Sequence, residues 1–411
     1  MSSAFSIALS ALTANSTAID VVGSNLANLN TTGYKQTDVD FETLMAQTMG
    51  VGQNSAQIGM GVGSVNTATE YTQGTIQTTN GPMDAAIQGD GFYVVQNSAN
   101  QTLYTRDGSF QVNAAGDIVT ATGENVQGWA AVNGTVNPNG AVGNLVVPLG
   151  STVQAVATTN MGVTVNLNAQ AATGATFSAP IQVYDSLGAK HTLSVNFTET
   201  GANAWSFAVT IPAADLTTGG TTSVATGTLA FDANGNLTSP TTAQAVNVTG
   251  LVDGAAALSI NWNMTTSAGA PMITQYAEAS SVGSTTQDGA AAGQITDVSL
   301  QNGGMLVANY SNGQQTTIGQ LALASIPNPE SLSSAGNNNL QATVSTGAIS
   351  VGAANTSGRG QIVAGALESS TVDMAAQFTK LLTYERGYQA ASRVITTSDQ
   401  LLQDAMSLVH P

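Results

Sequence analysis

The stretch VGSNLANLNTTGYK, residues 22–35, closes an apolar-striped segment at the start of the chain and decides how the fold begins. It carries Asn25, Asn28 and Asn30, which are poor helix formers because their side chains compete for the backbone's hydrogen bonds. Such residues are either solvated or paired with polar groups that a single copy of the chain lacks. Gly33 can supply the left-handed conformation that ends a helix. We therefore interpret the stretch as the end of an N-terminal helix.

Apolar residues at both ends of the chain recur at steps of three, four or seven, which predicts two amphipathic helices with near-heptad stripes. In the first stripe they are Phe5, Leu9, Leu12, Ile19, Val22, Leu26 and Leu29. In the second they are Leu367, Met374, Phe378, Leu381, Tyr384, Tyr388, Ala391, Ile395, Leu402 and Val409. Two ordinary helices of a globular core would show the same period. The prolines favour terminal helices, because they leave residues 1–81 and 330–410 free of the residue that breaks helices.

The interior between the two stripes alternates apolar and polar residues, which is the period of a half-buried strand. Clear examples are residues 193–197, 205–211 and 258–264. Asn-Gly and Asp-Gly pairs separate such segments, as hairpin turns require. Residues 295–324 read as a three-stranded meander in which both turns are specified.

These patterns predict an α+β multidomain chain. The N- and C-terminal helices are expected to pair as a coiled coil over residues 1–75 and 363–411, together with an extended connecting segment. A discontinuous, mainly antiparallel β domain is expected over 76–148 and 281–362. A second β domain, an outer barrel or sandwich, is expected as an insertion at 149–280.

Composition excludes several classes of partner and site. Only 8% of the 411 residues are charged, with 24 acids against 7 bases, and so few cations cannot form a patch for nucleic acid or anionic lipid. The absence of cysteine excludes disulfides and thiolate sites. The sequence contains no uninterrupted apolar run of about 18 residues, which is the length that predicts a membrane span. No Lys or Arg precedes Lys35, so the basic region of a secretory signal is missing and we expect the N-terminus to be retained.

No pattern in the sequence predicts catalysis, a cofactor or a metal site, and we expect that the protein is not an enzyme. His191 and His410 are interpreted as surface imidazoles. Residues 231–238, FDANGNLT, begin like a calcium loop but lack its final glutamate, which favours a plain hairpin turn. The glycines of 59–64 lack the context of a phosphate loop. The acidic residues of 38–42 are interpreted as a solvated face.

The terminal helices are expected to act as assembly elements. A helix with an apolar stripe must bury it, and residues 1–34 contain a single charge, Asp20, which suits a surface covered by neighbouring subunits. Asn25 and Asn28 would then set the register between helices, as a polar residue does in a coiled-coil seam. The residues expected at contacts between copies are Phe5, Leu9, Leu12, Ile19, Val22, Asn25, Leu26, Asn28, Leu29, Gly33, Phe378, Leu381, Tyr388, Ile395 and Leu402.

Several blocks, in order, resemble the flagellar axial proteins, the family of rod and hook subunits. They are SNLANLNTTGYK (24–35), TTNGPMDAAIQGDGFYVV (78–95), VYDSLGAKHTLSVNF (183–197), the meander, and the long C-terminal block 365–403. The resemblance covers both ends and most of the β framework, whereas 198–280 is similar only loosely.

The resemblance implies a structural subunit that assembles helically into a flexible curved tube, a universal joint that transmits torque from rod to filament. It implies an inner tube of terminal helices with β domains outside, and export by the flagellar type III apparatus without cleavage, to an extracellular place. The implied partners are copies of itself, the distal rod, hook cap and hook-filament junction proteins and the export apparatus, with no nucleic acid or small-molecule substrate.

Two alternatives stay open. The segment 149–280 favours a hook subunit over a distal rod subunit of the same family, because rod subunits generally lack such an insertion. A non-flagellar, β-rich surface adhesin would explain the turn-rich interior but gives no use for two heptad-striped ends.

Overall fold

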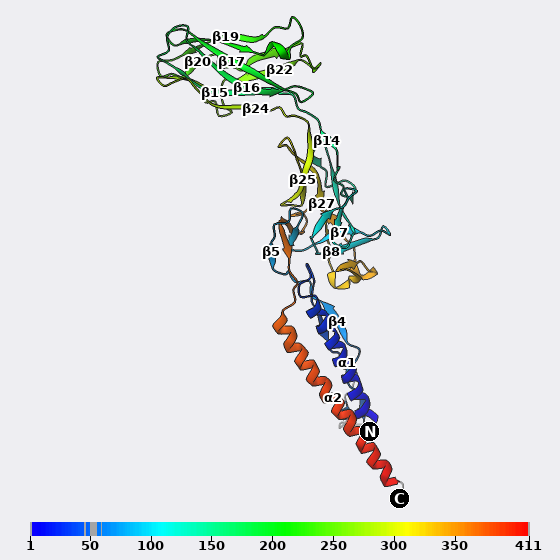
Figure 1. Cartoon of the computed structure of the whole chain (residues 1–411). Coiled ribbons are helices and arrows are strands. Elements are labelled where there is room, and N and C mark those ends of the chain that lie inside the picture. Colours follow the sequence, from blue (N-terminus) through cyan, green and yellow to red (C-terminus); the bar gives the residue numbers. More distant parts are fainter. Residues whose placement is uncertain (1, 45–46, 50–55, 59, 410–411) are drawn as a thin grey trace. The chain divides into compact units, whose positions relative to one another are not determined.

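The computed structural model describes residues 2–44, 47–49, 56–58 and 60–409. The described chain has one long helix at each end and strands in several sheets between them (Figure 1). It divides into two compact units, which we call the first and second units. The first comprises Met1–Leu149, Val298–Ala308 and Thr316–Pro411, and the second comprises Gly150–Asp297 and Asn309–Gln315. The narrower borders expected from sequence, at 75, 148, 280 and 362, stay predictions.

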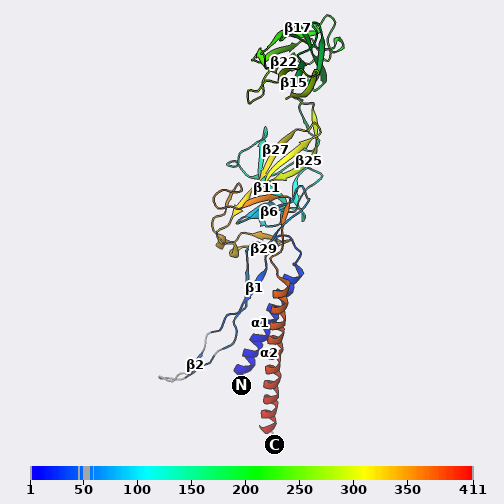
Figure 2. The same ribbon diagram turned by 90° about the vertical axis from the view of Figure 1, so that its left-hand side faces the viewer.

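The two helices, α1 (Ser2–Ala27) and α2 (Met374–Val409), lie side by side and run antiparallel (Figures 1 and 2). Small residues allow their close approach. Ala18 is fully buried, and a side chain at Gly387 of α2 would come within 2.6 Å of Asn15 Oδ1 on α1. The prediction of a helix at each end is confirmed. Leu367 was wrongly assigned to the second helix, because it lies in a strand that pairs with residue 77.

The helix α1 is apolar along its whole length. Residues Ala4–Ala27 reach the length and composition of a membrane-spanning helix, although the sequence holds no uninterrupted apolar run of that length. Core helices and signal sequences reach the same composition, so this finding identifies an apolar helix and nothing more specific.

An antiparallel arm follows α1. It is built from β1 (Thr37–Asp40) paired with β4 (Asn66–Thr69) and from β2 (Gln47–Met49) paired with β3 (Ala56–Ile58). Asp38 forms an ion pair with Lys380 of α2, and the rings of Phe41 and Tyr384 lie 5.8 Å apart. The arm therefore holds α2 as well as α1. The interpretation of 38–42 as a solvated acidic face was wrong at Asp38, because sequence spacing gave no sign of its partner.

The β part of the first unit contains one large sheet and two short two-stranded ladders. One ladder pairs β5 (Ile76–Thr78) with β33 (Ala366–Glu368), and the other pairs β6 (Ala85–Gln88) with β32 (Gln361–Ala364). The strands of the large sheet that lie within this unit are β7 (Phe92–Gln96), β8 (Thr102–Thr105), β9 (Phe110–Val112), β10 (Ile118–Thr120), β11 (Asn125–Val132), β12 (Thr135–Val136), β13 (Gly143–Asn144), β28 (Leu323–Ser325), β29 (Ser333–Gly336), β30 (Asn339–Gln341) and β31 (Ser350–Gly352).

The predicted meander is confirmed. Strands β25 (Gly293–Gln301), β26 (Met305–Tyr310) and β27 (Gln315–Leu321) are neighbours in that order, and β14 (Thr152–Val153) pairs with β25. The turn glycines Gly303, Gly304 and Gly313 have positive φ, which is the reason that these positions carry glycine.

The core of the second unit is formed by two five-stranded sheets. One sheet has β16 (Thr176–Tyr184), β17 (Lys190–Gly201), β18 (Ala204–Thr210), β19 (Ser223–Phe231) and β20 (Leu237–Ser239), and the other has β15 (Asn160–Asn168), β21 (Gln244–Val248), β22 (Leu258–Asn263), β23 (Ile273–Tyr276) and β24 (Ser281–Gln287). Alternate residues of β16, β17, β18 and β22 face the core, as the sequence predicts for 193–197, 205–211 and 258–264. The Phe207 and Trp262 rings meet edge to face across it at 5.0 Å. The second sheet is mixed, because β15 runs parallel to β22 and β23.

The prediction of a hairpin turn at 231–238 is confirmed. Strands β19 and β20 pair across it, Gly235 has φ +81, and Asp232 Oδ1 accepts the amides of Asn234 and Asn236 at 2.8 Å each.

The side chain of Asp288 holds the start of β15 through several hydrogen bonds. Its carboxylate accepts the amides of Thr159 and Asn160 at 2.8 and 2.9 Å, and it also accepts the Thr159 hydroxyl and the Asn160 side-chain amide. Partial burial opposes ionisation, but these hydrogen bonds outweigh it and lower the pKa of Asp288 from 3.8 to about 2.

We expect the hydrogen bonds of Asp288 to stabilise the folded state above pH 3.8 and to lose this effect as the pH falls toward 2. Over this range the carboxyl group binds a proton more readily in the unfolded state than in the folded state. The measurement is urea unfolding followed by the fluorescence of Trp205 and Trp262, both in the second unit. Asp288→Asn should lower the midpoint at pH 6, and the difference from the natural chain should shrink between pH 4 and pH 2. A difference that stays constant down to pH 2 would contradict the assignment.

Candidate functional site

The candidate functional site is the joint of the first unit, where the end of α1, residues 33–37, strand β33 and the start of α2 meet. At its centre the buried carboxylate of Glu368 lies between two cations. Lys35 Nζ is 2.6 Å from Glu368 Oε1, and Arg106 Nη1 is 3.3 Å from Oε2. The three side chains are at most 6% exposed. Two of the seven cations of the chain are therefore used in one buried cluster.

Further contacts hold each member of this cluster. Lys35 Nζ donates to the carbonyl of Thr72 at 2.7 Å, and Glu368 Oε1 accepts the amide of Gly74 at 2.7 Å. Arg106 Nη2 donates to the carbonyl of Gly89 at 2.9 Å. Burial lowers the pKa of Lys35, while its hydrogen bond to Glu368 works in the opposite direction. The cluster is a fixed structural tie, because buried charges need this many partners to be stable.

Asn25 ties the two helices to the arm. Its Nδ2 donates to the carbonyl of Thr37 at 2.8 Å and to Gln377 Oε1 of α2 at 3.3 Å. Its Oδ1 accepts the amide of Thr37 at 3.0 Å and the Tyr34 hydroxyl at 3.2 Å. The side chain is 1% exposed, and all its hydrogen-bonding capacity is used inside one chain. The polar groups that pair with Asn25 therefore lie within a single copy of the chain.

The other two asparagines differ from Asn25. Asn28 is half-buried and makes only local contacts, donating to the carbonyl of Ser24 at 2.9 Å and accepting the Thr31 hydroxyl at 3.1 Å. Asn30 is exposed. Asn28 also lines a cavity of about 600 Å³ in the first unit, together with Tyr34 and Asn338.

Gly33 connects the helix end to the ion cluster. Its φ of +66 confirms the predicted left-handed conformation, although α1 itself ends at Ala27 and a turn lies between them. Its amide donates to the carbonyl of Glu368 at 2.8 Å. A Cβ at this position would lie 2.6 Å from the backbone of Arg106. Backbone conformation and close approach therefore both require glycine.

The residues expected at contacts between copies fall into three groups by burial in one chain. Val22, Asn25 and Gly33 are already buried. Leu12, Ile19, Leu26, Asn28, Leu29, Leu381 and Ile395 are half-buried. Phe5, Leu9, Phe378, Tyr388 and Leu402 are between 37% and 50% exposed. The helix pair thus leaves much of the predicted stripe uncovered.

The sequence analysis missed further apolar residues on α2. Leu382, Val394, Leu401 and Met406 are between 45% and 71% exposed. The first three each lie next to a stripe position in the sequence, and a search for a single seam passes over them. A wider apolar face on a helix of 36 residues was the available signal.

The interpretation of His191 as a surface imidazole was wrong. Its side chain is 5% exposed and lies among the carboxylates of Asp185, Asp215 and Asp253 in the second unit. These aspartates are up to 62 residues away along the chain from His191, so no local pattern could reveal them. His410 lies outside the described residues.

Family models match both ends of the chain and its interior from 86 to 290. The matches are to the flagella basal body rod protein at residues 5–35, the flagellar hook protein FlgE/F/G D1 domain at 86–201, the flagellar basal body protein FlaE D2 domain at 148–290, and the flagellar basal body rod FlgEFG protein C-terminal at 363–408. The flagellar hook protein FlgE of Treponema pallidum is 33% identical to this chain, over 95% of this chain and 96% of its own. The chain belongs to the flagellar hook protein FlgE family.

Another relative is similar over nearly the whole length of this chain. The flagellar hook protein FlgE of Escherichia coli K12 is 30% identical over 98% of this chain and 100% of its own. Among solved structures, the flagellar hook protein FlgE2 of Helicobacter pylori has a TM-score of 0.50, covers 71% of this chain and 100% of its own, and is 14% identical. That last likeness shows a shared fold.

Removing the charge of Glu368 should loosen the joint. Glu368→Gln leaves Lys35 and Arg106 buried without a counter-ion, which costs about 3–5 kcal/mol when one partner of a buried pair is lost. We expect the amides of Gly33 and Gly74, both bonded to Glu368, to exchange with deuterium at least about a hundredfold faster. Glu385→Gln on exposed α2 is the matched control and should leave both rates unchanged. Equal exchange in the two variants would refute the structural role of the cluster.

Asn25→Leu should destabilise the monomer, because it leaves the buried polar groups of Thr37 and Gln377 unsatisfied, at about 1–3 kcal/mol per group. Asn28→Leu is the matched comparison, since its contacts are local and solvent can replace them. Limited proteolysis at the end of α1 reports the difference. Faster cleavage of the Asn25 variant alone is expected, and equal cleavage of both would contradict the assigned network.

Proposed function

We propose that this chain is a structural subunit of the bacterial flagellar hook, whose copies assemble into a flexible curved tube that transmits torque from rod to filament. The observation that carries the proposal is the apolar face that one helix pair leaves uncovered. Family membership supports the same role, since its relatives are named flagellar hook proteins.

The proposed assembly uses the helices as its inner element. In it α1 and α2 form a two-stranded coiled coil, and the outward residues of α2 pack against neighbouring copies. Burying one Leu, Phe or Met side chain stabilises by about 1.5–3 kcal/mol, so several such residues per copy favour a polymer over monomers. The half-buried Leu12, Ile19, Leu26 and Leu29 of α1 would become fully buried in the same contacts.

In the proposed assembly the joint would transmit force between the helices and the β strands of the first unit. A load on the helices reaches the β part of the first unit through Asn25, Gly33 and the cluster around Glu368. Buried groups with several hydrogen bonds and ion pairs resist displacement more than exposed pairs do. The joint would therefore behave as a stiff connection between the helices and the β strands.

Flexibility would come from the outer β faces. Only 8% of the residues of the whole chain are charged, and its sequence is rich in Gly, Ser, Thr and Asn. Each polar contact between such faces contributes only about 1 kcal/mol net, so neighbouring copies can slide without a large change in energy. In this proposal the helices hold the tube together and the outer faces slide as it bends.

The remaining parts of the role follow from the same proposal. The chain would be exported by the flagellar type III apparatus without cleavage and would lie outside the cell. It would contact copies of itself and, at the ends of the tube, the distal rod, hook cap and junction proteins. It would use no cofactor, nucleic acid or small-molecule substrate and would perform no catalysis. The second unit favours a hook subunit over a distal rod subunit, and the uncovered helix face disfavours an adhesin.

Disrupting the uncovered helix face should block assembly without unfolding the monomer. Leu402 is 40% exposed on α2, so Leu402→Ser costs the monomer little but places a hydroxyl in the proposed contact. The control is Leu149→Ser, the same change at a residue 51% exposed outside the helices. Sedimentation and negative-stain microscopy should show tubes for the control and monomers for Leu402→Ser. Tubes formed equally by both variants would refute the proposed contact.

A further inference from the structure

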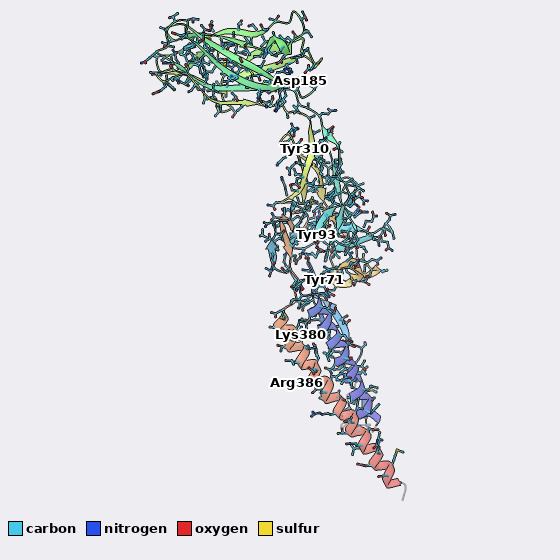
Figure 3. The ribbon with its side chains drawn as sticks, in the orientation of Figure 1. Tyr71, Tyr93, Asp185, Tyr310, Lys380 and Arg386 are labelled. Atoms are coloured by element: carbon cyan, nitrogen blue, oxygen red, sulfur yellow. The ribbon has the colours of Figure 1, made fainter. Side chains whose placement is uncertain are left out.

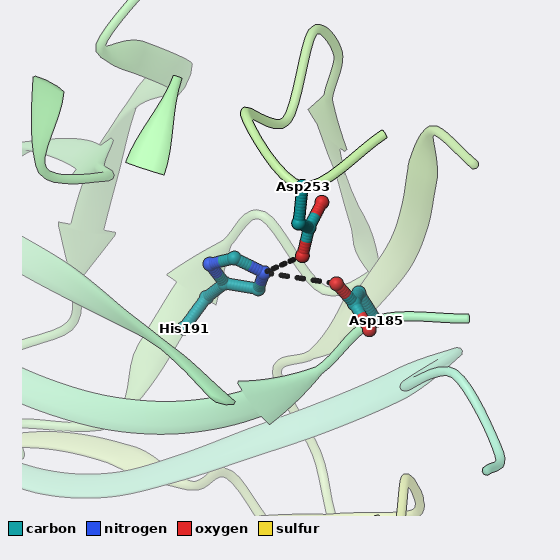
Figure 4. A group of neighbouring side chains, drawn as sticks. All are labelled: Asp185, His191 and Asp253. Atoms are coloured by element: carbon teal, nitrogen blue, oxygen red, sulfur yellow. Dashed lines mark hydrogen bonds and ion pairs between the residues drawn. The ribbon is translucent and has the colours of Figure 1, made fainter. Parts of the chain in front are cut away.

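Four side chains with metal-ligating atoms meet in the second unit, in a region to which the hook role assigns nothing. Asp185 lies in the turn between β16 and β17, and His191 lies at the start of β17. Asp253 lies in the segment between β21 and β22, and Asp215 ends a short 3-10 helix, Ala213–Asp215. Figure 4 shows the imidazole of His191 directed at the carboxylates of Asp185 and Asp253.

The spacing of these atoms suits a small divalent cation. His191 Nε2 is 3.2 Å from Asp185 Oδ2 and 3.6 Å from Asp253 Oδ2, and all three ligand atoms lie within 4.8 Å of one another. Ligands bound tetrahedrally to zinc at about 2.0–2.1 Å are separated by about 3.3 Å. The observed separations therefore need only small side-chain adjustments.

The two carboxylates are oriented in advance by the backbone. Asp185 Oδ1 accepts the amides of Leu187 and Ala189 at 2.8 Å each. Asp253 Oδ1 accepts the amide of Ala255 at 3.0 Å. In both residues the second oxygen, Oδ2, is left to face the imidazole.

Asp215 fixes the orientation of the imidazole from its other side. Its Oδ2 lies 3.2 Å from His191 Nδ1, so a proton on Nδ1 would point to this carboxylate and the Nε2 lone pair would face Asp185 and Asp253. Histidines that bind metals are commonly held in this way by an outer carboxylate. The amide of Val252 donates to the carbonyl of Asp215 at 3.0 Å, which ties this outer residue to the segment carrying Asp253.

The cluster carries an excess of carboxylates that no Lys or Arg of the second unit pairs with. Three carboxylates surround one imidazole, and the Asp185 side chain is fully buried. In the second unit, all of which the structure describes, Lys190 is the one Lys or Arg, and its ammonium lies over the Tyr184 ring at 5.9 Å. The surroundings thus favour a cation at this place.

We propose that Asp185, His191 and Asp253 form a binding site for a single zinc ion, with Asp215 as the residue that positions the imidazole. One imidazole nitrogen and two carboxylate oxygens are ligands that zinc accepts, and water would complete the coordination. The Asp253 side chain is 26% exposed, which gives the ion access from solvent. Binding would link the turn after β16 to the segment before β22, and so would staple two sheets of the second unit at one end.

The test is zinc binding to the full-length chain, measured by competition with a chromophoric chelator, together with the visible spectrum of the cobalt-substituted protein. We expect one zinc ion per chain, a cobalt spectrum typical of four-coordinate nitrogen and oxygen ligation, and a higher unfolding midpoint reported by Trp205 and Trp262. Asp253→Asn should weaken zinc binding at least a hundredfold and abolish the shift in midpoint. An amide oxygen can still accept the Ala255 amide, so this variant keeps the local fold.

Two further variants make the outcome decisive. Glu278→Gln removes one exposed carboxylate elsewhere in the second unit and should bind zinc like the natural chain. Asp215→Asn should keep one ion per chain but bind it about 10- to 100-fold more weakly, as expected for an outer residue. Failure of the natural chain to bind zinc in a one-to-one ratio, or equal binding by Asp253→Asn and Glu278→Gln, would overturn the proposal. These results would leave the proposed role in the hook unaffected, because that role is tested on the helices.

Discussion

The structure of the first unit depends on one buried carboxylate. Glu368 forms ion pairs with both Lys35 and Arg106. Its side chain also accepts the amide of Gly74, and its backbone carbonyl accepts the amide of Gly33. A lone charge at this depth would be expensive, and two cations without it would repel each other. Glu368 itself lies in β33, which pairs with β5. The end of α1, the β strands and the segment leading to α2 are therefore positioned by the same residue.

The helices divide their residues between two tasks. Alanine, glycine and asparagine make the contact inside one chain, where their small size or polarity suits close packing. The larger apolar residues, such as Phe378, Leu382 and Leu401, are left outward. A helix pair that buried its leucines internally would have nothing left to bind a neighbour. This division explains why the hydrophobic stripe alone does not identify the partner of each residue.

Local patterns in the sequence were enough to predict much of the fold. Alternation predicted the strands of the second unit, Asn-Gly pairs predicted the meander and hairpins, and proline-free ends predicted the helices, because each of these is a short-range property. The sequence could not reveal the joint or the His191 cluster. Lys35 and Glu368 are 333 residues apart, and Asp253 meets His191 only when the two sheets of the second unit pack on each other. Leu367 was predicted to be helical because its position fits the helical period, but it lies in β33, where pairing with β5 overrides that local pattern.

The separation of Lys35 and Glu368 also sets an order of events for a chain that emerges from its N-terminus. Lys35 and Arg106 appear early, but their counter-ion comes only when about nine tenths of the chain is present. Until then the joint cannot close, and α1 has no α2 to lie against. An incomplete chain therefore lacks a finished helix pair, because α2 (Met374–Val409) follows Glu368 and is the last element of the chain to appear.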